Sequence, residues 1–356
     1  MIKKALIIND TSNAYHWGCY GTSTEIHKRL ENIKYSVSSF GVEKIYNLNT
    51  PPKNDNDFYN EGFMRVFINE NSSLISLIKE SDLIIINGEG SLHDINKSSF
   101  NLLYVSFLAK NYFSKKVHLI NTSLFPSSQM NNDKNINNLY NKVLSTLDTI
   151  VVRETSSYSV LSEIGLNGSL GFDCLPLYLN RLDLKPSNIN NNEVIIGGGL
   201  GLNPEIFFKL ISNNKIIFNK YKLIYLTGAP SNPANDDIEF IKIMKNYNFD
   251  SEHRDVKNFN QWVETINNAH CLISGRFHHT IASACLKTPS IVFNSATPKN
   301  TALCKMLGLS GPLDIKNENT LVNFSNQLDL IEKNNSKIIS SDTHHKIISL
   351  GLNNFT

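Results

Sequence analysis

The stretch Asp82-Leu83-Ile84-Ile85-Ile86-Asn87, followed by Gly88-Glu89-Gly90, decides the fold class. A short apolar run with polar residues and glycines at its ends is typical of a strand that is buried on both faces. Similar runs stand at 5–8, 117–120 and 149–152, and segments of helical character lie between them. Buried strands that alternate with helices predict a parallel sheet covered by helices on both faces.

The same alternation begins again after Pro186–Asn192, a polar, asparagine-rich stretch that we interpret as a linker. It predicts an α/β protein of two tandem Rossmann-like domains with a cleft between them. We expect an N-terminal domain at 1–185, a C-terminal domain at 193–320, and a helical segment with a tail at 321–356. In the first domain, Val42–Leu48 is expected to form the second strand.

The composition excludes some classes of function. The chain has 356 residues, 41% of them hydrophobic, and a formal net charge of +2. This small charge excludes a protein built to neutralise many nucleic-acid phosphates. No run approaches the ~18 apolar residues of a membrane span, and five scattered cysteines without a CxxC motif favour a reducing cytoplasm. Roughly one residue in seven is asparagine, which we attribute mostly to AT-rich coding.

A first candidate loop, Asn13–Ser23, follows the first predicted strand. It contains His16 and Trp17, a titratable group and a stacking surface, beside two glycines that permit tight turns and close backbone approach. Open α/β sheets present ligand loops at this position, although the spacing matches neither a dinucleotide fingerprint nor a P-loop. The alternative is a loop whose Trp17 fills the core.

Two further candidates lie at the ends of predicted strands. The glycines beside Glu89 allow the backbone to bend and bring its carboxylate near a ligand, where it can take a proton from a hydroxyl. The alternative is a plain turn with an exposed Glu89. Arg153 follows the strand at 149–152, where an arginine grips a carboxylate or phosphate through two hydrogen bonds, or forms a salt bridge with Glu154 or another neighbour.

The sharpest motif is Ser274-Gly275-Arg276-Phe277-His278-His279, at the junction of a strand and a helix. Arg276 can fix an anion, the helix N-terminus adds partial positive charge, and a histidine there acts as acid or base near neutral pH. Lys299 follows the next strand and is either a second positive charge for the same cleft or an ordinary surface lysine. No third ligand at a recognisable spacing supports a zinc site, so we expect no metal.

Together these motifs resemble the polysaccharide pyruvyltransferase family over most of the chain. The resemblance rests on the loop after the first strand, Gly88-Glu89-Gly90-Ser91, Arg153-Glu154-x-x-Ser157, Gly171-Phe172-Asp173, Arg276-x-His278 and the segment with Asn294 and Lys299. It implies a GT-B-like fold and transfer of a pyruvyl group, as a ketal, from phosphoenolpyruvate to a sugar of a surface polysaccharide or its lipid-linked precursor. It also implies anion-binding or catalytic roles for Arg276, His278, Arg153 and Lys299.

The predicted site therefore has three parts. The catalytic candidates are His278, His279, Arg276 and Glu89, where Glu89 as the base is our own hypothesis and the choice between the histidines stays open. The residues expected to converge on the anionic donor are Arg153, Arg276, Lys299 and Ser274. The candidates for the sugar acceptor are Asn13, Tyr15, His16, Trp17, Asn87 and His93.

Two other functions stay open. A GT-B glycosyltransferase that uses a nucleotide-activated sugar, such as a CMP-linked acidic one, would need the same basic residues and histidine. A non-catalytic carbohydrate-binding protein is the third, although it does not need His, Arg and Lys in one cleft. We expect phosphoenolpyruvate as co-substrate and no other cofactor, a glycan or lipid-linked acceptor, and no nucleic acid. The expected location is the cytoplasm, with loose association at the inner face of the membrane as an open alternative.

Overall fold

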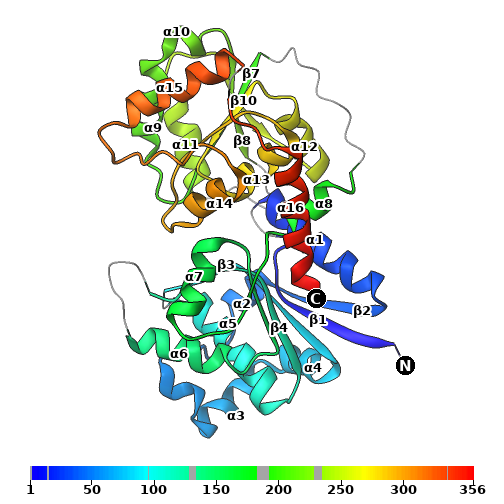
Figure 1. The fold of residues 1–356 in the computed structure, drawn as a ribbon. Helices are drawn as coiled ribbons and strands as arrows, with labels where there is room; N and C mark the ends of the chain where they lie inside the picture. The colour runs from blue at the N-terminus through cyan, green and yellow to red at the C-terminus, as the bar shows by residue number, and fades with distance from the viewer. Residues whose placement is uncertain are drawn as a thin grey trace. The chain divides into compact units, whose positions relative to one another are not determined.

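The structure is a computed structural model that describes residues 2–13, 16–94, 96–127, 134–182, 192–227, 235–334 and 336–356. Contacts divide the chain into two units, each of which is an α/β body built on its own parallel sheet (Figure 1). Unit 1 contains Met1–Ser12, Thr22–Cys174 and Ser349–Thr356. Unit 2 contains Asn13–Gly21 and Leu175–Ile348.

The sheet of unit 1 has the strand order β2-β1-β3-β4-β5-β6 among the described residues, and all neighbours are parallel. Its strands are β1 (Lys3–Asp10), β2 (Tyr35–Gly41), β3 (Leu83–His93), β4 (Lys116–Phe125), β5 (Thr149–Val152) and β6 (Ser169–Leu170). The connecting helices are α2 (Val42–Tyr46), η1 (Asp55–Phe58), α3 (Glu61–Glu70), α4 (Ser72–Glu80), α5 (Lys97–Phe107), η2 (Leu108–Tyr112), α6 (Lys134–Leu144) and α7 (Thr155–Glu163). The turn η3 (Asn353–Phe355) joins this unit from the end of the chain.

Helix α1 (Trp17–Asn32) begins in unit 2 and continues in unit 1 from Thr22. The strands of unit 1 are apolar on both faces because helices cover both. Along β1, Leu6 and Ile8 join a core with α2 to α6, whereas Ala5 and Ile7 join a smaller core that includes α1. This burial on both faces explains the continuous apolar runs in the sequence.

The sheet of unit 2 has the order β11-β10-β7-β8-β9 among the described residues, again with parallel neighbours. Its strands are β7 (Glu193–Gly197), β8 (Lys222–Thr227), β9 (Ser251–Asp255), β10 (Cys271–Ser274) and β11 (Ser290–Val292). Its helices are α8 (Leu175–Leu179), α9 (Pro204–Asn213), α10 (Lys215–Phe218), α11 (Asn235–Met244), α12 (Phe259–Asn267), α13 (Phe277–Leu286), α14 (Lys299–Leu307), α15 (Thr320–Glu332) and α16 (Ser341–Leu352), the last of which ends in unit 1.

Each sheet has a switch point where the order of the strands reverses. In unit 1 the chain moves from β1 to β2 on one side and returns to β3 on the other; in unit 2 it moves from β7 through β9 and returns to β10. Open α/β sheets bind ligands at the carboxyl ends of the strands beside such a point. The ends of β1 and β3, and those of β7 and β10, are therefore where a site is expected.

Two expectations about strands were wrong. Val42–Leu48 is not a strand: Val42–Tyr46 is helix α2, and the edge strand β2 lies just before it. The serine-rich sequence of β2 concealed it, because an edge strand has a neighbour on one side only and tolerates polar side chains. Strand β3 does not end at Asn87, since its pairing with β4 resumes after a register shift between Glu89 and Leu92.

The two units do not coincide with the predicted domain ranges. Asn13–Gly21 belongs to unit 2, where the Trp17 indole N–H donates to the carbonyl of Val256. Residues 349–356 belong to unit 1, where the Asn354 side chain donates to the carbonyl of Phe172. Most of the predicted linker, 186–191, lies outside the described residues. Within the part of the chain that is described, no helix combines the length and apolar character needed to cross a membrane.

Candidate active site

Unit 1 has a buried polar cluster formed within β3 and by residues that follow β5 and β6. Glu89 lies in β3 with a left-handed backbone (φ 47°), and its side chain is buried. A non-glycine residue in this region is uncommon and marks a locally strained backbone. Gly88 is needed here, because a Cβ on it would lie 2.2 Å from Thr122 Oγ1 of β4.

Arg153 is the centre of this cluster. Its Nη1 donates to Glu89 Oε2 at 2.7 Å and to Asp173 Oδ2 at 2.8 Å, and its Nε donates to Ser123 Oγ at 3.0 Å. Burial disfavours the charge, but the neighbouring carboxylates, led by Glu89, outweigh it and raise the pKa of Arg153. The predicted role of Arg153 in binding the donor does not fit this arrangement, because the guanidinium is 2% exposed and already faces two carboxylates.

Asparagines form a second buried network in unit 1. Asn87 donates to Ser23 Oγ and accepts from the side-chain amide of Asn121, while the Asn9 side chain donates to the carbonyl of Asn87. Asn87 is fully buried, which contradicts its predicted contact with an acceptor sugar. The other candidate on β3, His93, is only partly buried, and its Nδ1 lies 2.7 Å from the carbonyl oxygen of Gly90.

The second site lies in unit 2, at the turn between β10 and α13. Ser274 Oγ accepts from the backbone N–H of Arg276 at 3.1 Å, lies 2.9 Å from His279 Nδ1 and donates to the carbonyl of Gly198. Ser274 is buried, so the structure gives it the task of holding the turn and His279 rather than the predicted contact with the donor.

His279 is completely buried against the end of β7. A Cβ on Gly197 would lie 2.4 Å from its Nδ1, so the glycine run after β7 lets the imidazole approach the backbone. The ring also lies 5.8 Å from that of Trp262 and 4.9 Å from that of His16. Burial and then the charge of Arg276 lower the pKa of His279 well below its usual value, so the ring is neutral.

His16 packs into the same cluster instead of facing a ligand from the first candidate loop. It is 5% exposed, its Nδ1 accepts from the backbone N–H of Gly18, and its ring stacks on that of His278 with the centroids 5.9 Å apart. Burial, followed by the charges of His279 and Arg276, lowers the pKa of His16 well below its usual value. The predicted contact of His16 with an acceptor is therefore not supported.

The remaining candidates from the first loop differ among themselves. Trp17 is 7% exposed and packs against Tyr20, so the alternative of a tryptophan that fills the core is the one observed. Asn13 is exposed, and Tyr15 lies outside the described residues. Helix α1 already begins at Trp17, so the two glycines that follow provide close packing within a helix and not tight turns.

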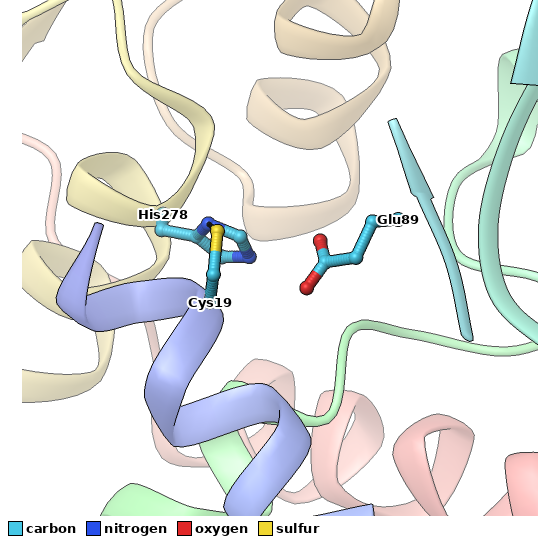
Figure 2. Close-up of side chains that lie close together, drawn as sticks. All are labelled: Cys19, Glu89 and His278. Atoms are coloured by element: carbon cyan, nitrogen blue, oxygen red, sulfur yellow. Dashed lines mark hydrogen bonds between the residues drawn. The ribbon is translucent and has the colours of Figure 1, made fainter. Parts of the chain in front are cut away.

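His278 is the histidine of the pair that retains some exposure, 7% against 0% for His279. Its Nδ1 lies 3.7 Å from Cys19 Sγ in the first turn of α1. Figure 2 shows the sulfur of Cys19 against the imidazole ring of His278; the third side chain in the view, Glu89, belongs to unit 1.

Arg276 is the N-cap residue of α13, and an acidic partner orients its side chain. Its Nη2 donates to Asp237 Oδ1 at 2.7 Å, and the Tyr225 hydroxyl donates to the same oxygen at 2.7 Å. Tyr225 in turn accepts from the backbone N–H of Gly198. This chain of bonds joins β7, β8 and α11 to the guanidinium, which is one-tenth exposed.

Lys299 stands at the start of α14, and its Nζ lies 5.9 Å from the centroid of the Phe277 ring at the start of α13. The neighbouring Asn300 holds the two helix starts together, because its amide donates to the carbonyls of Gly275 and Phe293. Two helix N-termini, Arg276 and Lys299 thus gather positive charge at one place in unit 2. This is the part of the predicted site that the structure brings together.

The comparisons with known proteins point to one family. The sequence model for polysaccharide pyruvyl transferase matches residues 9–297, which is most of the chain. The chain belongs to the polysaccharide pyruvyl transferase family. It is therefore an enzyme of the transferase class, and the family implies a small-molecule donor and a sugar acceptor. No match to the sequence is found among curated proteins.

Solved structures support the fold of this family member. UDP-GlcNAc 2-epimerase from Neisseria meningitidis, bound to UDP-GlcNAc, has a TM-score of 0.65 at 11% identity over 98% of this chain and 97% of its own. The epimerase from Methanocaldococcus jannaschii gives 0.56 at 12% identity over 98% and 99%, and the glycotransferase of kitacinnamycin gives 0.51 at 11% over 98% and 96%. The predicted GT-B-like class of two tandem α/β domains is confirmed.

Sequence reasoning missed several residues that the structure places beside the predicted site of unit 2. Asp237 and Asn300 are ordinary helix-start residues in the sequence, and no spacing links them to the motif at Arg276. Cys19 lies in the first candidate loop but was not among the candidate residues, and only the fold shows that it meets His278. The glycine run at 197–199 was the one sequence signal for this part of the structure. It allows His279, Tyr225 and Gly275 to pack closely against the backbone.

Proposed function

We propose that the protein transfers a pyruvyl group from phosphoenolpyruvate to two hydroxyls of one sugar in a surface polysaccharide or its lipid-linked precursor. The observation that carries the proposal is the junction of α13 and α14 in a chain of this family, where Arg276, Lys299 and His278 gather. Phosphoenolpyruvate is small and carries about three negative charges, so it needs the cations and helix N-termini found there.

Ketal formation sets the chemical tasks. One acceptor hydroxyl adds to the enol carbon C2 as C3 takes up a proton, and its own proton leaves to a base. Loss of phosphate and attack of the second hydroxyl, whose proton leaves with the phosphate, complete the ketal, so the products are the pyruvylated sugar and inorganic phosphate. No electrons enter or leave, so the reaction needs no redox cofactor. One acid for C3 and one base for the hydroxyl suffice.

We assign the acid to His278. It is the less buried histidine of the pair, whereas His279 is sealed behind Ser274, Gly197 and Trp262. The more exposed ring is the better candidate, because proton transfer needs the acid within about 3 Å of the substrate or joined to it by one water. His279 then supports the turn that carries Arg276 and His278.

We retain Glu89 as the proposed base for the acceptor hydroxyl. Its oxygens accept from Thr11 Oγ1 at 3.2 Å and from Arg153 Nη1 at 2.7 Å, which orients the carboxylate. In this proposal Arg153 holds the Glu89 carboxylate in place and does not bind the donor anion. Asn13 remains an exposed candidate for the sugar and His93 a half-buried one. We place the reaction in the cytoplasm, at the inner face of the membrane when the acceptor is lipid-linked.

A second candidate is transfer of a sugar from a nucleotide donor. It is favoured by the likeness in fold to an epimerase that was solved with UDP-GlcNAc bound. The same positive junction of α13 and α14 would suit a diphosphate. The two candidates differ in which anion stabilises the protein.

Thermal melting with ligands separates the two candidates. Phosphoenolpyruvate at about 100 times its Kd should stabilise the fold by about 2.7 kcal/mol, and UDP or CMP should not. Arg276→Ala should abolish the shift and the turnover, whereas Arg65→Ala, an exposed arginine in unit 1, should keep both. Stabilisation by a nucleotide alone would refute the pyruvyl donor and favour the second candidate. Acceptor-dependent release of phosphate from phosphoenolpyruvate provides the direct assay.

A further inference from the structure

The first turn of α1 lies tightly against the start of α13 within unit 2. A Cβ on Gly18 would lie 2.2 Å from the Cβ of His278, so only glycine allows this approach. His16 stacks on the His278 ring with an interplanar angle of 24°. Cys19 Sγ lies 3.7 Å from His278 Nδ1. His16, just before α1, and Gly18 and Cys19 in its first turn thus confine the His278 imidazole by stacking, by packing and by a polar contact.

We propose that Cys19 is a positioning residue, whose sulfur accepts the Nδ1–H of His278 and leaves Nε2 as the nitrogen that exchanges a proton with the substrate. The inference rests on the proposed function only in so far as His278 is the acid. Which nitrogen carries the proton is set by the bond that the other nitrogen makes.

Sulfur suits this task because a thiol is both a weak acceptor and a weak donor. The Nδ1–H of His278 donates to Cys19 Sγ when the ring is an imidazolium and when it is neutral, so the contact survives the loss of the Nε2 proton. Cys19 is half-buried, as its place beside an active imidazole requires. A carboxylate in the same place would hold the imidazolium more strongly and resist release of the proton.

The other groups of unit 2 around His278 make this contact informative. His16 and His279 are neutral because burial lowers their pKa values. Arg276 is the nearby cation, at the N-cap of the same helix, and Lys299 lies over the ring of the adjacent Phe277. Cys19 Sγ contacts Nδ1 itself, so changing Cys19 should alter the titration of His278 directly.

The experiment uses the full chain with Cys19→Ala, Cys19→Ser and Cys19→Asp, and Cys285→Ala as the matched control at the far end of α13. Histidine-selective nitrogen NMR reports the protonated nitrogen of His278 and the pH midpoint of its titration. Cys19→Asp should raise that midpoint by about one pH unit or more, since a carboxylate replaces a neutral acceptor. Cys19→Ala should move it in the opposite direction, Cys19→Ser should lie close to wild type, and Cys285→Ala should coincide with it.

Kinetics provide the second readout. Cys19→Ala should lower kcat about tenfold with little change in the KM for phosphoenolpyruvate, because a misoriented acid weakens the chemical step and not binding. Cys19→Ser should restore most of the loss. The proposal is overturned if neutral His278 carries its proton on Nε2, or if the midpoint is the same in wild type, Cys19→Ala and Cys19→Asp. These NMR results are obtained without substrate, so they decide the role of Cys19 even if no pyruvyl transfer is found.

Discussion

The two sheets have the same parallel architecture, but their switch points carry opposite chemistry. In unit 1, one arginine is enclosed by two carboxylates, and the remaining partners are hydroxyls and amides. In unit 2, Arg276 faces one carboxylate and stands beside Lys299, three imidazoles and two helix N-termini. Unit 1 therefore has one arginine between two carboxylates, whereas unit 2 brings an arginine and a lysine to the N-termini of two helices.

This difference shows what the topology determines and what it leaves open. The switch point determines where polar groups meet, because the connections that leave its two adjacent strands run to opposite sides and leave a crevice at the strand ends. The side chains then decide the ligand: carboxylates and amides suit sugar hydroxyls, whereas arginine, lysine and helix N-termini suit an anion. An arginine at a strand end belongs to either kind of site. Its buried partners, and not its position, distinguish Arg153 from Arg276.

The largest expected effect comes from removing these two arginines. Arg153→Ala leaves Glu89 and Asp173 buried without their cation and should cost unit 1 about 3–5 kcal/mol of unfolding free energy. Arg276→Ala leaves one carboxylate, Asp237, which keeps the Tyr225 hydroxyl, so its stability cost should be smaller while turnover is lost. Urea unfolding and the pyruvyl-transfer assay measure the two effects.

The distribution of tryptophan makes this measurement specific to each unit. The chain has two tryptophans, and both Trp17 and Trp262 belong to unit 2. Circular dichroism reports both units and fluorescence reports unit 2, so Arg153→Ala should shift the first signal more than the second. Arg65→Ala, in an exposed ion pair of unit 1, should change neither by more than about 0.5 kcal/mol. If Arg153→Ala lost as much turnover as Arg276→Ala without losing stability, Arg153 would bind the donor, as the sequence predicted.

The next effect separates the adjacent histidines. His278→Ala should lower kcat by a factor of about 10²–10⁴ because it removes the acid, a loss larger than its cost in stability explains. His279→Ala should open a cavity beside Gly197 and Trp262, cost about 2–4 kcal/mol of stability and affect kcat less. Turnover and melting temperature of both variants decide the matter. A larger kcat loss in His279→Ala would assign catalysis to the other ring.

The sequence was a good guide to the sheets and to the main motif. Apolar runs predicted most of the buried strands, and the Arg-x-His-His motif was placed correctly at the junction of a strand and a helix. Periodicity failed for β2, whose serines conceal an edge strand, and for β3, which continues through Glu89 by shifting its register. Both failures concern strands whose pairing depends on neighbours far away in the sequence.

Contacts between residues far apart in the sequence could not be predicted from any local pattern. Cys19 and His278 lie 259 positions apart, and Arg153 pairs with carboxylates 64 and 20 positions away. Glu154 was considered as a partner of Arg153 because, without a structure, closeness along the chain is the only distance that is known. Sequence reasoning did not single out Asn9 and Asn121, and it expected Asn87 to contact the acceptor; the structure joins the three in a network at the switch point of unit 1.

The smallest expected effect is a pH dependence that should be stronger in unit 2, with its two deeply buried histidines, than in unit 1, where burial also lowers the pKa of His118. His16 and His279 are buried and neutral, with pKa values well below the usual one, whereas in the unfolded chain each binds a proton below about pH 6.5. The unfolded state then binds more protons than the native state. The free energy of unfolding should therefore fall as the pH drops through about 6.5, by up to about 1.4 kcal/mol per pH unit for each histidine.

Urea unfolding of unit 2, followed by tryptophan fluorescence between pH 5 and 8, measures this slope. His279→Asn removes one titrating ring, so the slope below pH 6.5 should decrease by about one proton, even though the variant is less stable at every pH. His345→Asn, an exposed histidine on α16 in the same unit, should leave the slope unchanged. An unaltered slope in His279→Asn would mean that the ring takes up a proton in the folded protein. The imidazole cluster would then add to the positive charge of unit 2, and the contrast with unit 1 would be larger than the structure indicates.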